Sequence, residues 1–148
     1  MENRKKIIDE SCPTLTISIH LNSFPSDESV CGAQVFYPKK HETRTNSRTD
    51  EQTSESFAAG VQKALANSVS GSEGKEALTK NDIFLFQNID SPIILVECGF
   101  LSNAAEREKL KTAEYQESLA AAIWEGVNEN LCLKPVGERL IVDSANNG

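Results

Sequence analysis

Two apolar segments of the chain each contain one side chain capable of catalysis. Residues 17–23 carry His20, and residues 93–100 carry Glu97. Both segments have the composition of β-strands, and the carboxyl ends of parallel strands meet at one edge of a sheet. The sequence therefore predicts an imidazole and a carboxylate side by side. Such a pair is half of a zinc hydrolase site, in which the imidazole holds the metal and the carboxylate acts as a base.

His20 is the centre of this hypothesis. Zinc binds neutral imidazole, and the end of a strand holds the ring more rigidly than a loop does. The simpler alternative is a structural or surface histidine. The other histidine of the chain, His41, lies in a polar stretch between Lys40 and Glu42 with no apolar residues around it, which favours a surface position.

Glu97 follows a run of apolar residues and directly precedes Cys98 and Gly99. A half-buried carboxyl group in this position should have a raised pKa, which suits a general base. Gly99 would allow the backbone a close approach or a positive φ. The alternative is a glutamate that caps a neighbouring helix or forms an ion pair with Arg107.

Asn22 lies two residues after His20 and points to the same side if the strand continues. Its amide could then orient a ligand or form a hydrogen bond with a substrate carbonyl. A turn-forming asparagine is an equally good interpretation of this residue.

Composition narrows the class of protein. With 15 basic and 22 acidic residues among 148, the net charge is −7, which argues against nucleic-acid binding. The four cysteines lie far apart without a CxxC pair, so we expect buried thiols, neither a zinc finger nor a disulfide framework. No segment has the length and apolar character of a transmembrane helix or the pattern of a signal peptide.

The pattern along the chain predicts strands that alternate with helices. Expected strands span residues 14–20, 33–37, 83–86 and 93–97, and expected helices span 3–10, 50–69 and 113–131, with one more helix starting at 102–103. Glu106 would lie in the first turn of that helix, where the helix dipole favours an acidic side chain. Residues 24–31, 39–52 and 70–75 read as loops, the last of them exposed. Strands alternating with helices indicate a three-layer α/β domain, and the run 93–97, apolar on both faces, an inner strand.

Taken together, these motifs resemble the zinc-dependent N-acetylmuramoyl-L-alanine amidases of the Amidase_3 type, and most of all the CwlD-type amidases of the spore cortex. Residues 18–22 match the SxHxN signature, and residues 94–103 match the VE-x-GFLSN segment. Further similarity lies in residues 32–37, 114–116 and 119–123, so that the resemblance runs from about residue 3 to residue 131.

The resemblance implies a three-layer α/β/α domain with a mixed, mostly parallel sheet of the phosphorylase/hydrolase-like kind. It also implies hydrolysis of the amide between N-acetylmuramic acid and L-alanine in peptidoglycan, outside the cytoplasm, in cell-wall or spore-cortex remodelling. His20 would bind Zn²⁺, Glu97 would be the catalytic base, and Asn22 would position the substrate. Zinc lowers the pKa of bound water to about 7, which makes hydroxide available at neutral pH.

The family also uses a second histidine and a glutamate as zinc ligands, in motifs that this sequence does not contain. We therefore expect residues 1–133 to be the carboxyl-terminal part of an amidase domain, incomplete at its amino-terminal side, followed by a tail at 134–148. A piece of a full amidase is the favoured interpretation. One alternative is a catalytically degenerate module that binds peptidoglycan or a regulatory partner protein. Another is a site whose missing ligands come from a partner or a second copy, in which case His41 becomes a candidate ligand. In isolation the chain should self-associate, bind zinc weakly and lack amidase activity.

Overall fold

The computed structural model describes residues 1–39 and 53–131. The segment predicted as a polar loop at 39–52, His41, Cys132 and the tail at 134–148 lie largely or wholly outside these residues. The boundary predicted at residue 133 also lies outside them and stays a prediction. None of the described helices is long and apolar enough to span a membrane.

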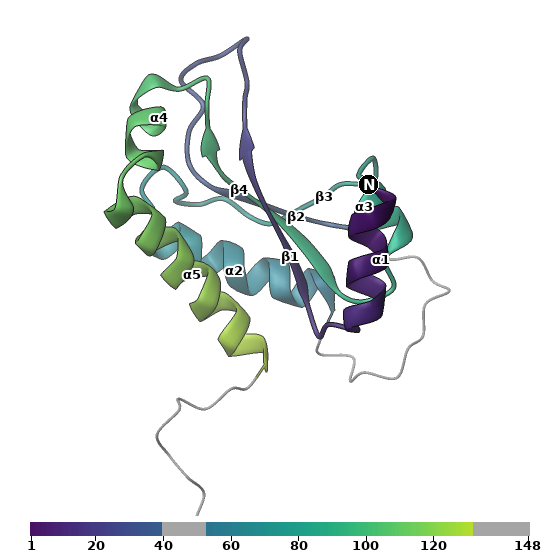
Figure 1. The fold of residues 1–148 in the computed structure, drawn as a ribbon. Helices are drawn as coiled ribbons and strands as arrows, with labels where there is room; N and C mark the ends of the chain where they lie inside the picture. The colour runs from purple at the N-terminus through teal and green to yellow at the C-terminus, as the bar shows by residue number, and fades with distance from the viewer. Residues whose placement is uncertain (40–52, 132–148) are drawn as a thin grey trace, which may run out of the picture.

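A four-stranded mixed sheet with helices on both faces forms the centre of the fold, which confirms the predicted α/β class (Figure 1). The strands are β1 (Thr16–Asn22), β2 (Gln34–Tyr37), β3 (Leu78–Thr79) and β4 (Ile93–Phe100), and the helices are α1 (Glu2–Ser11), α2 (Ser54–Ser68), α3 (Phe84–Asn88), α4 (Ala104–Leu110) and α5 (Ala113–Leu131). Their spatial order is β1-β4-β2-β3. The pairs β1–β4 and β2–β3 are parallel and β2–β4 is antiparallel.

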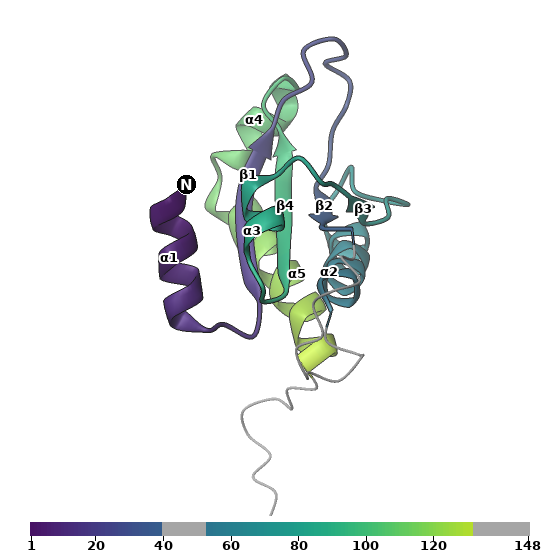
Figure 2. The ribbon, with the colours of Figure 1, turned by 90° about the vertical axis from the view of Figure 1, so that its right-hand side faces the viewer.

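The inner strand β4 pairs with β1 on one side and with β2 on the other. Its residues are buried along nearly the whole length, as its continuous apolar sequence predicts for a strand covered on both faces. Helices α2, α4 and α5 lie on one side of the sheet and α1 and α3 on the other. Seen edge-on, α1 stands apart at the β1 side, and none of its residues is buried (Figure 2).

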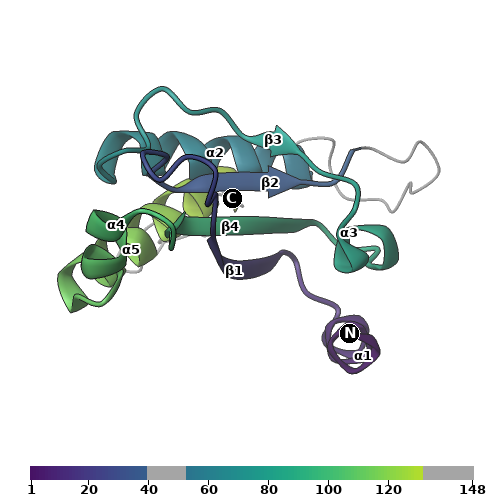
Figure 3. The same ribbon diagram turned by 90° about the horizontal axis from the view of Figure 1, so that it is seen from above.

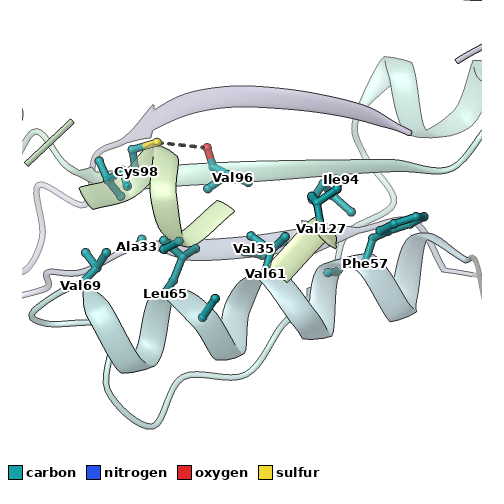
Figure 4. Close-up of a cluster of buried hydrophobic side chains, with 14 residues drawn as sticks. Ala33, Val35, Phe57, Val61, Leu65, Val69, Ile94, Val96, Cys98 and Val127 are labelled. Atoms are coloured by element: carbon teal, nitrogen blue, oxygen red, sulfur yellow. Dashed lines mark hydrogen bonds between the residues drawn. The ribbon is translucent and has the colours of Figure 1, made fainter. Parts of the chain in front are cut away.

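The larger core lies between the sheet and helices α2 and α5. Figure 4 shows its side chains, among them Phe57, Val61 and Leu65 from α2 against Val35, Ile94 and Val96 from the sheet. Helices α2 and α5 cross closely because Gly126 has no side chain. A Cβ atom at Gly126 would lie 2.4 Å from the Cα of Val61. This glycine therefore sets how near the two helices come, and with them the sheet they support.

One predicted strand, at residues 83–86, is wrong. The segment forms the short helix α3, and the strand in this region is instead β3, paired with β2 through Phe36 and Leu78. A short apolar run fits either state, and here Leu85, Phe86 and Ile89 form one buried helical face against Ile93 and Leu95. The two residues of β3 are exposed and gave no apolar alternation to detect.

The turn predicted to be exposed at 70–75 is only partly so. Ser72 within it is fully buried, and its Oγ accepts a hydrogen bond of 2.8 Å from the backbone N–H of Ala33. The expectation of buried thiols is likewise only partly met among the described cysteines: Cys98 is buried, Cys31 is half-buried and Cys12 is exposed. The predicted strands at 14–20, 33–37 and 93–97 and the helices at 3–10 and 113–131 are all present, with small changes at their ends.

Candidate active site at the carboxyl ends of β1 and β4

The two predicted catalytic residues are direct neighbours in the sheet. His20 on β1 and Glu97 on β4 are register partners of the parallel pair. Seen from above, β1 and β4 run side by side, with β2 on the far side of β4 (Figure 3). Register partners on adjacent strands point to the same face, so the imidazole and the carboxyl group share one side of the sheet. The expected juxtaposition is therefore present.

The environment of Glu97 suits a proton-transferring group. Burial raises the pKa of its carboxyl group, while the neighbouring side chains of His20 and Lys80 partly offset that rise. Its Oε2 atom is buried and has no hydrogen-bond partner among the described residues. A buried polar atom without a partner is costly, and such atoms in native proteins commonly await a ligand or a water. The Oε2 atom of Glu97 can therefore accept a hydrogen bond from a ligand or a water molecule.

The alternative interpretations of Glu97 find no support. Arg107 directs its guanidinium to backbone carbonyls, donating to Leu101 at 2.6 Å and Ser102 at 3.2 Å. The cap of helix α4 is Asn103, whose Oδ1 accepts from the N–H of Glu106 at 3.1 Å. Glu97 is therefore neither the helix cap nor the partner of Arg107 in the part of the chain that the structure describes.

The imidazole of His20 is exposed at the edge of the sheet. Its Nε2 lies 2.8 Å from the Oγ of Ser18, two residues earlier on the same strand. A hydroxyl rotates freely between donor and acceptor, so Ser18 can support either tautomer of the ring. An exposed ring held by one short side chain is accessible to a metal or a substrate.

Asn22 lies beyond a change of register. From His20 to Asn22 strand β1 advances two residues, while from Glu97 to Phe100 strand β4 advances three, which marks a bulge in β4. The Oδ1 atom of Asn22 accepts from the N–H of Ser23 at 2.7 Å. This contact reaches the adjacent residue and not the residue two positions on, as an asparagine turn requires, so the turn-forming interpretation of Asn22 stays a prediction. A role in substrate positioning stays a prediction.

The loop that follows His20 is fastened to the segment that follows Glu97. The N–H of Phe24 donates to the Oγ of Ser102 at 2.9 Å, and the Nδ2 of Asn103 donates to the carbonyl of Glu28 at 3.0 Å. Ser102 and Asn103 thus tie the loop after β1 to the segment after β4, next to the predicted pair His20 and Glu97. Sequence reasoning placed them at the start of a helix and in the VE-x-GFLSN segment, but nothing local shows their contacts across more than 70 residues.

The described residues do not form a complete metal centre. No group of three histidine, cysteine, aspartate or glutamate side chains that could hold a metal ion occurs within residues 1–39 and 53–131. His41 lies outside this part of the chain. The exposed ring of His20 and the unpartnered Oε2 of Glu97 fit part of a zinc hydrolase site, namely one ligand and one base, and the remaining ligands are not among these residues.

Fold and site together define an α/β domain with an imidazole and a carboxyl group on adjacent parallel strands at one sheet edge. The family model of the N-acetylmuramoyl-L-alanine amidases, Amidase_3, matches residues 1–129. The chain belongs to this family, as the SxHxN and VE-x-GFLSN motifs predict.

Individual relatives agree with this assignment. The chain is 35% identical over 127 residues to the germination-specific N-acetylmuramoyl-L-alanine amidase of Bacillus subtilis, covering 86% of this chain and 48% of that protein. Among solved structures, the CwlD amidase of Clostridioides difficile, in complex with the GerS lipoprotein, matches at a TM-score of 0.76 and 36% identity, covering 90% of this chain and 62% of that one. An N-acetylmuramoyl-L-alanine amidase from Clostridium difficile 630 matches at a TM-score of 0.72 and 28% identity, covering 90% and 66%. The chain thus spans about half the length of the curated relative.

Proposed function

We propose that the protein hydrolyses the amide bond between N-acetylmuramic acid and L-alanine in peptidoglycan. The observation that carries the proposal is the register pair of His20 and Glu97 at the end of two parallel strands, within a chain of the amidase family. The names of the relatives from Bacillus and Clostridioides support the same bond as the substrate. We propose further that it acts in the cell wall or the spore cortex, outside the cytoplasm, since one relative is named germination-specific and another is named a cell wall amidase.

Glu97 is the proton-transferring residue of this proposal. Its raised pKa and the unpartnered Oε2 suit a base that takes a proton from the attacking water and then delivers it to the leaving amine nitrogen. Asn22, beside the same edge, would contact the substrate through the side-chain N–H groups of its amide, since its Oδ1 already accepts from Ser23.

Zinc is the proposed cofactor, with His20 as one of its ligands. When bound, the ion supplies a Lewis acid and a water of lowered pKa. Because the described residues contain no group of three potential ligands, further ligands have to come from elsewhere, from further residues of the natural protein, from a second copy or from a partner. Separately from the metal ligands, the complex of the CwlD amidase with the GerS lipoprotein supports a regulatory partner protein for this chain.

The test is an assay for the bond that is cut. The chain is incubated with purified peptidoglycan and zinc, alone and together with the part of the Bacillus amidase that it does not match. Mass spectrometry then looks for stem peptides with a free L-alanine amino terminus. We expect these products in the mixture and not with either polypeptide alone.

The second candidate function is a degenerate module that binds peptidoglycan or a partner without cleaving anything. The incomplete set of metal ligands among the described residues is the observation that favours it. Sedimentation of the chain with insoluble peptidoglycan, without release of stem peptides in any mixture, would establish this alternative and contradict the amidase proposal.

A further inference from the structure

A second glutamate, Glu106, contacts the end of β4, the strand that carries the proposed catalytic base. It has no part in the mechanism above. It belongs to the first turn of α4 and is 2% exposed. Glutamate is almost never fully buried unless its carboxylate is paired or hydrogen-bonded. The burial of this side chain therefore requires hydrogen-bond partners for its carboxyl oxygens.

Both oxygens of Glu106 bind backbone N–H groups of other segments. Oε1 accepts from Gly32 at 2.6 Å, and Oε2 accepts from Phe100 at 2.7 Å. Phe100 ends β4, and Gly32 lies just before β2. One carboxylate thus bridges two strands that are neighbours in the sheet, through hydrogen bonds of the strong, charge-assisted kind.

The bridge begins where the regular ladder stops. Glu97 is the last residue of β4 that stands in regular register with both neighbours, with His20 on β1 and with Gln34 on β2. Beyond Glu97, the pairing with β1 shifts through the bulge, and the pairing with β2 ends because β2 begins at Gln34. Beyond Glu97, the hydrogen bonds to the carboxylate of Glu106 therefore take the place of direct backbone hydrogen bonds between β4 and the β2 side.

The surroundings confine this carboxylate. A Cβ atom at Gly99 would lie 3.2 Å from Oε2 of Glu106, so the bulge packs directly on it. A Cβ atom at Gly32, which has φ +84°, would lie 1.8 Å from the carbonyl oxygen of Gly71. Both segments held by the carboxylate thus depend on glycine for their close approach.

A half-buried cation, Lys75, lies near the carboxylate. Lys75 lies over the ring of Phe100, with Nζ 5.4 Å from the ring centroid, and donates to the carbonyl of Cys31. Burial lowers the pKa of Lys75, and the neighbouring Cys31, Glu106 and Glu73 oppose that decrease. The lysine and the carboxylate therefore hold the same two backbone segments, around residues 31–32 and around Phe100.

We propose that Glu106 is a positioning residue for Glu97, which it serves by fixing the bulge that ends β4 and tying it to the backbone before β2. Bulges next to catalytic residues set the direction of a neighbouring side chain. The carboxyl group of Glu97 lies three residues before the anchored N–H of Phe100, so release of the anchor frees its direction. This inference rests on the proposed function only in calling Glu97 the base.

The test compares Glu106→Gln and Glu106→Asp with wild type, in the full chain. Gln keeps the shape of the side chain but places an amide NH₂ against a backbone N–H donor, and Asp keeps the charge but shortens the reach. The matched control is Glu108→Gln on the same helix, because Glu108 is exposed and pairs with Lys111 at 2.6 Å. Nuclear magnetic resonance at one fixed pH follows the side-chain carboxyl carbon of Glu97, assigned with Glu97→Gln, and hydrogen exchange of the Gly32 and Phe100 amides.

We expect a single sharp Glu97 signal in wild type and in the control, and a broadened or split one in both Glu106 variants. Exchange of the two amides should be about tenfold faster or more, as expected for the loss of hydrogen bonds to a charged group. An unchanged Glu97 signal would overturn the proposal, whether or not the amides exchange faster. Global unfolding of both variants would also overturn it, because Glu106 would then act on the whole fold.

These readouts need no enzymatic turnover, so the two proposals fail separately. If Glu97 proves dispensable for amide hydrolysis while its signal responds to Glu106, the proposed function is wrong and the positioning stands. If hydrolysis is found, a positioning role further predicts that Glu106→Gln lowers kcat and leaves KM nearly unchanged, since Glu106 makes no contact with substrate.

Discussion

His20 and Glu97 stand directly opposite each other in the parallel pairing of β1 and β4, and Glu97 is the last residue of β4 in regular register with both of its neighbours. The pair thus lies at the last regular position before the bulge, beyond which β1 and β4 pair again at Asn22 and Phe100. Regular pairing fixes the distance between the two backbones at the pair, and a bulge next to it can set the direction of a side chain.

Zinc content tests the role of His20. After dialysis, we expect the isolated chain to retain less than one zinc ion per molecule, because one imidazole and one carboxyl group do not complete a tetrahedral site. His20→Ala should remove the residual zinc. Metal analysis of both proteins measures this, and stoichiometric zinc that survives His20→Ala would place the metal elsewhere.

Gly126→Ala tests the crossing of α2 and α5. Alanine is the better helix former by about 1 kcal/mol. Here, however, its Cβ would lie 2.4 Å from the Cα of Val61, a backbone atom that cannot turn away. We expect the steric clash to outweigh the gain in helix propensity. The net loss should be about 1–3 kcal/mol in the free energy of unfolding, measured in urea. Ala121→Val adds volume at an exposed position of the same helix and should change stability far less.

The stability of the fold should decrease at alkaline pH. Burial, and secondarily Glu97, raises the pKa of the Cys98 thiol from 9.0 to about 11. Between these values the unfolded chain releases a proton that the folded chain keeps, so the free energy of unfolding falls as pH rises from about 9 to about 11. The contribution has an upper limit of about 2–3 kcal/mol.

Cys98→Ala removes this thiol and should flatten that part of the stability curve, although it costs some apolar burial at every pH. Urea unfolding at several pH values measures the slope. Equal slopes for the two proteins between pH 9 and 11 would contradict the assignment to Cys98.

Tyr115→Phe should leave stability unchanged or raise it by about 1 kcal/mol. The hydroxyl of Tyr115 is buried without a hydrogen-bond partner among the described residues, and burial raises its pKa to about 12. Removing a buried polar atom that has no partner relieves a desolvation cost. A clear loss of stability in urea would mean that the hydroxyl binds a group outside this set of contacts.

The edge strand β1 should promote self-association. Ile17, Ile19 and Leu21 are exposed by 36%, 58% and 49%, and edge strands offer unpaired backbone groups to a second chain. We expect sedimentation velocity to detect dimers or larger species of the isolated chain, and Ile19→Lys to reduce them. Monomers at all concentrations in wild type would contradict this prediction.

The fold class could be predicted because its strongest signals are local. The continuous apolar run of β4 indicates an inner strand, and the helical spacing of α5 gave its bounds of 113–131 correctly. The short helix α3 could not be distinguished from a strand, since five residues carry too little periodicity. Strand β3 has exposed residues and exists only through its pairing with β2.

The same difference between local signals and contacts made only on folding holds for the site residues. His20 and Glu97 were found because each follows an apolar strand. Glu106 was assigned only to a helix terminus, since its real contacts, with Gly32 and Phe100, come from chain folding and not from its neighbours in sequence. The bulge that displaces Asn22 from the regular register depends likewise on β4.

Hydrolysis of peptidoglycan by wild type and Glu97→Gln tests the central claim most directly. Both proteins are supplied with zinc and with the part of the Bacillus amidase that the chain does not match, and the release of free L-alanine amino termini is followed over time. The account predicts zinc-dependent release by wild type and a rate at least about a hundredfold lower for Glu97→Gln, as expected for loss of a general base. Equal rates for the two proteins would contradict it.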